Sequence, residues 1–234
     1  MKIGMACGTN DLVLLPFFKE LKSSGLIDYL ELHIKSNATI KQLRDWQNTG
    51  LVKYIHSENG GRAEFVKEYL DMAIDVWTLS PYKGIIFDIG ISGEAYDLTS
   101  DELNWGKCLL PENMPYKTSF GDICVGYMPS EMPKTFTFDV SHAWITANQL
   151  HLDPKQLVLD FLKLKPSHIH LTDCYGTNDH LVMGTGEIDW QFVLDNLPKK
   201  ITVTIETDNV REYRRENIKK DLLFFKALYD SKDR

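Results

Sequence analysis

Short apolar runs alternate along this sequence with longer segments whose apolar residues recur at helical spacing, and this alternation limits the folds open to the chain. Eight apolar runs are predicted to be strands, and helical segments separate nearly all of them. The predicted strands are 2–7, 27–34, 51–56, 84–90, 107–112, 135–140, 168–173 and 201–206. Strands that alternate with helices in this way form a parallel sheet.

The helical segments repeat often enough to predict a closed barrel. They are 11–25, 39–50, 61–79, 153–164, 188–197 and 211–230, with at most a short helix at 129–132. Gly25 and Gly50 are natural stops for the first two, and Pro154 suits the first turn of another. Eight strands in 234 residues predict one domain, residues 1–234, folded as a (β/α)8 TIM barrel. An open doubly wound sheet is the alternative, but residues 6–11 lack the GxGxxG pattern of its nucleotide-binding form.

Composition excludes several classes of protein. With 43% hydrophobic and 25% charged residues, the chain resembles an ordinary globular protein with a sizeable core. A net charge of -7 disfavours nucleic acid as a partner. The apolar start is interrupted by polar residues and is a poor signal peptide, and no run is long enough to span a membrane. Four cysteines without a CxxC pair predict reduced thiols, so we expect a soluble, cytoplasmic protein.

Most of the predicted strands finish in a side chain that can bind a metal ion or move a proton. These side chains are Glu31, His33, His56, Asp88, Glu112, Asp139, His142 just beyond its strand, His168, His170, Asp173 and Glu206. In a TIM barrel the carboxyl ends of all strands meet at one mouth. We therefore expect these groups, which are far apart in sequence, to lie close together.

Each of these residues has a simpler interpretation when taken alone. A single carboxylate at a strand end is usually a helix cap or an ion-pair partner, and a single histidine is usually a hydrogen-bonded core residue. Many of them at one buried mouth would repel and desolvate one another. A divalent cation relieves this cost, because carboxylates and neutral imidazoles are its ligands. The sequence therefore predicts a metal site.

Four segments resemble motifs of the xylose-isomerase-like TIM barrels, a superfamily of sugar isomerases and epimerases that also includes the endonuclease IV group. They are LLPENMP (109–115), TFDVSHAW (137–144), HIHLTDCYGTNDHLVMGTGEIDW (168–190) and VTIET (203–207). Their order and spacing agree over essentially the whole chain. The resemblance implies a shared metal site formed by Glu112, Asp139, His170 and Glu206. Three carboxylates and one imidazole favour Mn²⁺ or Mg²⁺, with Zn²⁺ and Co²⁺ as alternatives.

The resemblance first implies a metal-dependent isomerase or epimerase with a small, sugar-like substrate. Glu112 and Glu206 would be both ligands and catalytic residues, one removing a proton from carbon and the other returning it. His142 and His180 would bind substrate hydroxyls, and His56 and Glu31 would shape the pocket. Members of the superfamily often associate, so a homo-oligomer is left open. His168, deeper along its strand than His170, is predicted to be structural.

The alternative that the resemblance implies is a phosphodiesterase of the endonuclease IV kind, which acts at abasic sites and holds three zinc ions. His56, His142 and His180 match its additional metal ligands. Asp88 stands where that group has a histidine, and Asn178 stands where it has an aspartate. These two departures and the acidic net charge favour the isomerase. A barrel that only binds a ligand or a metal is a third hypothesis.

Overall fold

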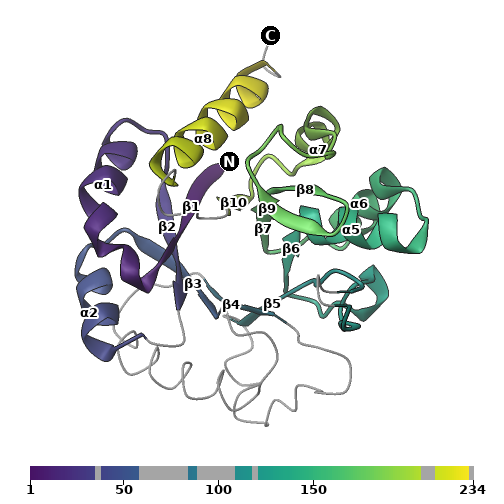
Figure 1. Cartoon of the computed structure of the whole chain (residues 1–234), viewed down its shortest axis with the longest axis horizontal. Coiled ribbons are helices and arrows are strands. Elements are labelled where there is room, and N and C mark those ends of the chain that lie inside the picture. Colours follow the sequence, from purple (N-terminus) through teal and green to yellow (C-terminus); the bar gives the residue numbers. More distant parts are fainter. Residues whose placement is uncertain (35–37, 58–83, 89–108, 118–120, 207–213, 232–234) are drawn as a thin grey trace.

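The computed structural model describes residues 1–34, 38–57, 84–88, 109–117, 121–206 and 214–231. Within these residues, eight parallel strands pair in a closed ring in the order β1, β10, β7, β6, β5, β4, β3, β2 (Figure 1). Their bounds are β1 Lys2–Gly8, β2 Tyr29–Ile34, β3 Val52–Ser57, β4 Gly84–Asp88, β5 Leu109–Glu112, β6 Thr137–Asp139, β7 His168–Leu171 and β10 Thr202–Ile205. A separate antiparallel hairpin joins β8, Asp173–Tyr175, to β9, Asn178–Leu181.

Helices lie around the outside of this ring (Figure 1). They are α1 Leu15–Ser23, α2 Ile40–Asn48, α5 Val140–Leu150, α6 Pro154–Lys163, α7 Trp190–Asn196 and α8 Arg214–Ser231, with the 3-10 turns η1 Thr9–Leu14 and η2 Pro129–Glu131. The predicted α/β fold with a TIM-barrel-like sheet is confirmed. The full eightfold repeat of strand and helix is not established, because the segments after β3 and β4 lie outside the described residues. The helix predicted for 61–79 is among them.

Helix boundaries follow the local signals in the sequence. Gly25 and Gly50 have φ angles of +71° and +66°, a left-handed conformation that glycine adopts without strain, and they follow α1 and α2 as predicted. Asp153 caps α6 by accepting a hydrogen bond from the backbone nitrogen of Lys155 at 2.9 Å, and Pro154 is the first residue of that helix.

Helix α5 is the main departure from the predicted elements. The sequence predicted a strand over 135–140 and no helix after it, whereas β6 ends at Asp139 and α5 starts at Val140. The Oδ1 atom of Asp139 caps the helix by accepting a hydrogen bond from the backbone nitrogen of His142 at 2.8 Å. The first eight residues of α5, 140–147, are all buried. A helix buried on all sides has no polar face, so it lacks the periodicity from which helices are predicted.

Successive side chains of the strands point to opposite faces of the sheet, and the two faces form separate apolar regions. Met5, Leu30 and Ile55 belong to the main core, which also includes buried residues of the surrounding helices. A second, smaller cluster consists of Tyr29, Tyr54, Ile86 and Leu110 from neighbouring strands. Strand β1 leaves room for this cluster at Gly4, where any Cβ atom would overlap the Tyr29 ring. Residues two positions further along these strands supply the polar groups described below.

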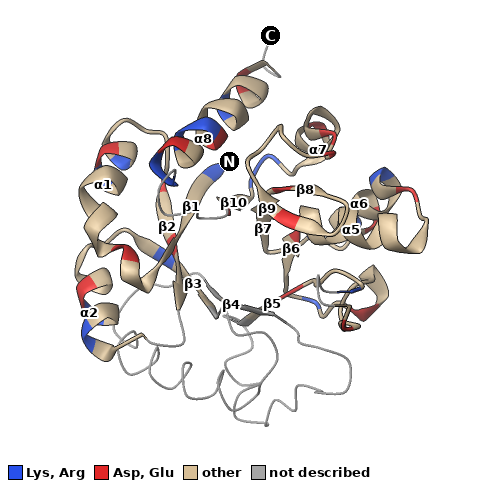
Figure 2. Cartoon of the chain, viewed as in Figure 1, with Lys and Arg blue, Asp and Glu red and all other residues tan. Residues whose placement is uncertain are grey.

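Helix α8 covers the ring next to β1 and presents charges of both signs (Figure 2). Arg214 is buried and pairs with Asp11, which precedes α1. Arg215 and Lys219 of this helix are exposed. No helix among the described residues is long and apolar enough to cross a bilayer. The described cysteines, Cys7, Cys124 and Cys174, are buried free thiols.

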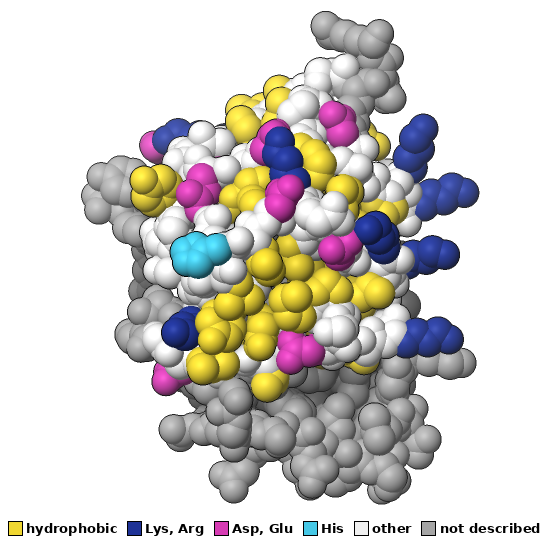
Figure 3. All heavy atoms as spheres, turned by 90° about the vertical axis from the view of Figure 1, so that its right-hand side faces the viewer, with side chains coloured by type: hydrophobic (Ala, Val, Ile, Leu, Met, Phe, Trp, Pro, Cys, Tyr) yellow, Lys and Arg dark blue, Asp and Glu magenta, His cyan; other side chains and the backbone are white. Residues whose placement is uncertain are grey.

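The face formed by α5, α6 and α7 mixes apolar and charged side chains (Figure 3). Leu152 and Leu164 are among the large apolar side chains exposed in the protein. Exposed apolar groups between charges are normal on a folded domain.

A buried carboxyl group on α8 gives a prediction about pH. Asp221 accepts a hydrogen bond from the backbone nitrogen of Met183 at 2.7 Å, and burial raises the pKa of its carboxyl to about 7. An unfolded aspartate ionises near pH 4. The unfolded state therefore loses this proton first as pH rises from 4 to 7, which lowers the free energy of unfolding. We expect Asp221→Asn, which cannot ionise, to stabilise the protein at pH 8 by on the order of 2 kcal/mol.

Urea unfolding of both proteins at pH 4 and pH 8 measures this effect. The stabilisation should be small at pH 4 and should grow up to pH 7, because only the wild type titrates at this position. Equal stability of the two proteins at pH 8 would contradict the prediction.

Candidate metal centre

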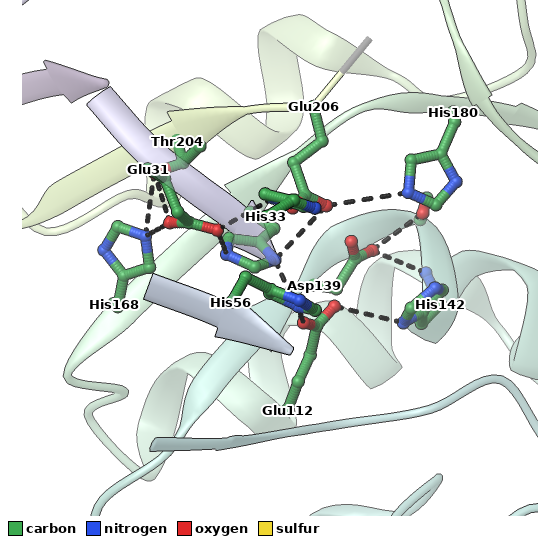
Figure 4. A network of polar contacts seen from close by, with 12 residues as sticks. Glu31, His33, His56, Glu112, Asp139, His142, His168, His180, Thr204 and Glu206 are labelled. Carbon is green, nitrogen blue, oxygen red and sulfur yellow. Dashed lines mark hydrogen bonds and ion pairs between the residues drawn. The ribbon is translucent and has the colours of Figure 1, made fainter. Parts of the chain in front are cut away.

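Carboxylates and imidazoles gather inside the ring, most of them toward the carboxyl ends of its strands, with His168 deeper at the start of β7 (Figure 4). They are Glu31 and His33 from β2, His56 from β3, Glu112 from β5, Asp139 from β6, His168 and His170 from β7, and Glu206 directly after β10. All except His33 are buried. Parallel strands thus bring together residues that are far apart in the sequence, as predicted for a barrel mouth.

The four residues of the predicted shared metal site lie together. Glu112, Asp139, His170 and Glu206 each offer one ligand atom, and these four atoms lie within 4.8 Å of one another. The Nδ1 atom of His170 is 3.1 Å from Oε2 of Glu112 and 3.3 Å from Oε2 of Glu206. Two carboxylates from separate strands therefore flank one imidazole nitrogen.

The hydrogen bonding of this cluster fits a bound cation. Asp139 uses Oδ1 to accept from the hydroxyl of Ser141 at 2.7 Å, but its buried Oδ2 has no hydrogen-bond partner in the described part of the chain. Both ring nitrogens of His170 lie near carboxylates but make no hydrogen bond of normal geometry there. Buried polar atoms without partners are costly, and a divalent cation would satisfy them. An oxygen-rich set with one imidazole suits such an ion.

Without a cation, a proton on His170 offsets part of the negative charge of the cluster. Burial alone would lower the pKa of His170, but Glu112, Glu206 and Glu31 raise it well above its usual value. Burial would raise the pKa of Glu112 and Glu206, and the neighbouring His170 lowers both instead. Burial raises the pKa of Asp139. A proton on His170 thus partly neutralises the carboxylates, and a bound cation would compete with that proton.

His33 joins this network, although the sequence analysis placed it at a strand end without including it among the site residues. Its Nε2 atom lies 3.2 Å from Oε1 of Glu31 and 3.0 Å from Oε1 of Glu206. Its ring stacks on His56 with 4.4 Å between centroids. The spacing of Glu31 and His33, two residues apart on one strand face, was the signal in the sequence that could have identified it.

His56 and Asp88 were both predicted as possible additional ligands. The structure describes the side chain of His56 but not that of Asp88. The Nε2 atom of His56 lies 2.8 Å from Oε2 of Glu112. His56 also forms a second possible ligand set with Glu31, His170 and Glu206, whose ligand atoms likewise lie within 4.8 Å of one another. Asp88 ends β4 and its backbone is in register with Glu112, but its side chain is not among those described.

A second group of polar side chains lies beside the first, at the rim. His142 places Nδ1 3.4 Å from Oε1 of Glu112 and Nε2 3.5 Å from Oδ2 of Asp179. The other oxygen of Asp179, Oδ1, lies 3.0 Å from Nδ1 of His180, whose Nε2 is 3.7 Å from Glu206. Burial would lower the pKa of His142, but Asp139 and Asp179 raise it to about 10. The structure thus brings both predicted rim histidines, His142 and His180, to the site.

Asp179 is a site residue that the sequence analysis did not assign. Asn178 stands at the position where the resemblance called for an aspartate, and the side chain that contacts both rim histidines comes from the next residue. The β8–β9 hairpin explains this shift, since it turns tightly between Tyr175 and Asn178 and His180 has a φ angle of +57°. A one-residue shift along a strand reverses the face of every side chain, and sequence spacing alone does not reveal it.

Asp173 has a structural role at the base of this hairpin. It is fully buried and accepts hydrogen bonds from the backbone nitrogens of Cys174, Gly184, Gly186 and Ile188 and from the indole of Trp190. Donors from segment 184–190 therefore converge on one carboxylate. Trp190 is buried in the main core.

Comparison with solved structures shows the same fold in enzymes of two kinds. Endonuclease IV from Thermus thermophilus matches with a TM-score of 0.66 at 16% identity, over 99% of this chain and 100% of that one. L-ribulose 3-epimerase also matches with a TM-score of 0.66, at 11% identity, over 99% and 95%. An AP endonuclease of family 2 from Brucella melitensis matches with a TM-score of 0.62 at 14% identity, over 93% and 97%.

These likenesses show a shared fold and leave the activity open. No protein-family model matches the sequence, and comparison with curated protein sequences gives no match. The resemblance to xylose-isomerase-like barrels, first inferred from four sequence motifs, is confirmed at the level of the fold. An epimerase and two endonucleases are similar to this chain over nearly its full length, so the fold does not choose between the two reactions.

Proposed function

We propose that this chain is a divalent-metal-dependent isomerase or epimerase that acts on a sugar or sugar-like hydroxy-ketone. The observation that supports this proposal is the pair formed by Glu112 and Glu206. They come from separate strands, and their carboxylates lie 3.1 Å and 3.3 Å from the same imidazole nitrogen of His170. Two carboxylates at one cation position can face a small bound molecule from two sides.

The residues that would hold the cation are Glu112, Asp139, His170 and Glu206. When bound, a divalent ion of this kind polarises the substrate carbonyl and stabilises negative charge on its oxygen. One of the two glutamates, as the carboxylate, removes a proton from the carbon next to that carbonyl. The other, as the carboxylic acid, returns a proton to the neighbouring carbon or to the opposite face. The oxygen-rich set favours Mn²⁺ or Mg²⁺, with Zn²⁺ and Co²⁺ as alternatives.

The remaining polar residues suit a small hydroxylated substrate. His142 and His180 lie at the rim, and their contacts with Asp179 keep both rings beside the two glutamates. His180 is partly exposed, which places an imidazole where a substrate hydroxyl can reach it. His33 contacts Glu206 directly and can exchange a proton with it.

The second candidate is a metal-dependent phosphodiesterase of the endonuclease IV kind. One observation favours it: Asp179 contacts both His142 and His180 beside Glu112, and these are residue types that can ligate a metal ion. His56 on Glu112 adds another ligand to the same side. Such an enzyme would clamp a phosphate between several cations, so it differs from the isomerase in metal content.

Metal content and isotope exchange test the proposal together. We expect about one tightly bound Mn²⁺ per chain after reconstitution, measured by plasma mass spectrometry. In D2O, the enzyme should incorporate deuterium at carbon when incubated with its sugar from a panel of ketoses and aldoses, measured by proton NMR. This exchange reports proton transfer at carbon, which a phosphodiesterase or a binding protein does not perform.

The opposite results would support the alternatives. About three metal ions per chain, together with cleavage of abasic duplex DNA that Glu112→Gln abolishes, would overturn the isomerase. Binding of a sugar without exchange or turnover in the full panel would indicate a barrel that only binds.

A further inference from the structure

Glu31 lies below the metal cluster and is completely buried in the barrel interior. Both of its oxygens have partners. Oε2 accepts a hydrogen bond from the hydroxyl of Thr204 at 2.8 Å and lies 3.1 Å from Nε2 of His168. Oε1 lies 3.2 Å from Nε2 of His33 and 3.0 Å from Nε2 of His170. Thr204, His168 and His33 thus fix this carboxylate by hydrogen bonds, and His170 lies beside it at ion-pair distance.

The partners of Glu31 on its inner side are themselves held in place. His168 contacts the hydroxyl of Thr202 through Nδ1 at 2.9 Å and stacks on the ring of Tyr54 with 4.2 Å between centroids. The Tyr54 hydroxyl contacts the same Thr202 hydroxyl at 2.8 Å. This layer under the metal cluster leaves Glu31 little freedom to turn.

The two ring nitrogens of His170 face different carboxylates. Nε2 faces Glu31, whereas Nδ1 faces Glu112 and Glu206 of the metal cluster. A neutral imidazole has one N–H and one free electron pair, and only the nitrogen with the electron pair can bind a cation. Glu112 and Glu206 are themselves proposed ligands, so a bound cation would take the place of a proton at Nδ1. Glu31 is then the carboxylate beside an N–H on Nε2, which makes Nδ1 the ligand.

We propose that Glu31 is a positioning residue, which orients His170 and keeps its proton on Nε2 so that Nδ1 binds the cation. This inference rests on the proposed metal centre of Glu112, Asp139, His170 and Glu206. Glu31 does not touch the substrate or the cation in this arrangement. Carboxylates that orient a ligating histidine in this way raise its basicity and strengthen metal binding.

A competing interpretation makes Glu31 a ligand of a second cation, together with His56, His170 and Glu206. The contacts of Glu31 make this interpretation less favourable. Both of its oxygens already take part in hydrogen bonds, which a cation would have to displace. The two interpretations differ in the number of cations that the wild type binds, so they can be separated by experiment.

Titration calorimetry of Mn²⁺ into metal-stripped protein tests the inference. Glu31→Gln keeps the size of the side chain but removes its charge, and we expect it to weaken Mn²⁺ binding about 10- to 100-fold with unchanged stoichiometry. Glu20→Gln is the matched control. It removes the same charge from an exposed glutamate of α1, so its Mn²⁺ affinity should stay within about threefold of the wild type.

The tautomer of His170 can be read in the wild type without any substitution. With ¹⁵N-labelled histidine and diamagnetic Zn²⁺ bound, we expect a proton on Nε2 and a ligated Nδ1, with the signals of His170 assigned by their loss in His170→Gln. This measurement decides the inference even if Glu31→Gln does not fold.

Four results would overturn the inference, and they refute different parts of it. Equal Mn²⁺ affinity of folded Glu31→Gln and wild type, or a proton on Nδ1, would refute the role of Glu31 and leave the metal centre intact. Two cations in the wild type and one in Glu31→Gln would make Glu31 a ligand. A wild type that binds no divalent cation would refute the metal centre itself and, with it, this inference.

Discussion

Glu206→Gln is expected to lower kcat by at least about 1,000-fold at saturating metal and substrate. Glutamine is nearly the same size but cannot take up a proton, so the exchange between substrate carbon and the side chain stops. The substitution also removes a negative charge that faces His33 and His170 at 3.0 Å and 3.3 Å. A loss of metal affinity should accompany the loss of kcat, because the same carboxylate is a proposed ligand.

The expected result is measured as turnover and as deuterium incorporation from D2O at Mn²⁺ concentrations that saturate the variant. Glu187→Gln is the control, since Glu187 is exposed and hydrogen-bonds Asn148 at the surface. That variant should keep the activity of the wild type. If Glu206→Gln retained a tenth or more of wild-type kcat, Glu206 could not be the acid or base of the reaction.

Asp173→Ala is expected to lower the free energy of unfolding by about 4 kcal/mol or more, which would make it among the most destabilising substitutions in the chain. Five hydrogen-bond donors lose their acceptor at once, and four of them are backbone nitrogens of the β8 and 184–190 segments. Buried donors without a partner each cost free energy. The same segments hold the β8–β9 hairpin, so Asp179 and His180 should move as well.

Urea unfolding compares Asp173→Ala with Asp195→Ala. Asp195 is an exposed aspartate on α7 that accepts a hydrogen bond from Gln191, and its loss should change stability by about 0.5 kcal/mol or less. Gly186→Ala gives an independent check, because its added Cβ would overlap the carboxylate of Asp173 and disturb the same network. A loss of less than about 1 kcal/mol in Asp173→Ala would show that backbone and water replace the carboxylate.

Much of the site was predictable because of where polar residues interrupt apolar strands. Glu112, Asp139, His170 and Glu206 each follow an apolar run, and a parallel barrel brings such positions to one mouth. His56, His142 and His180, also predicted from the sequence, contact Glu112 or Glu206. The alternation of strands and helices predicted that strand-end groups would meet, whereas the choice of the first four residues came from the resemblance of four motifs.

Other parts were not predictable from the same pattern. Helix α5 is buried on all sides over 140–147 and therefore shows no amphipathic period. Asp179 reaches the rim histidines only because of the local geometry of a hairpin whose register the sequence does not specify. His33 was visible as a strand-end residue, but its place between Glu31 and Glu206 depends on rotamers and on the curvature of the barrel.

By itself, the sequence determined the alternation of strands and helices and the polar residues at the strand ends, since both depend on local periodicity along the chain. Only the tertiary structure decided which oxygen faces which nitrogen. Glu31 meets His168 across 137 residues of sequence, and the contacts of His170 with Glu31 and Glu112 also join separate strands. The physical reason is that the closed ring of strands fixes the distances between side chains, whereas sequence spacing fixes only the face of a strand.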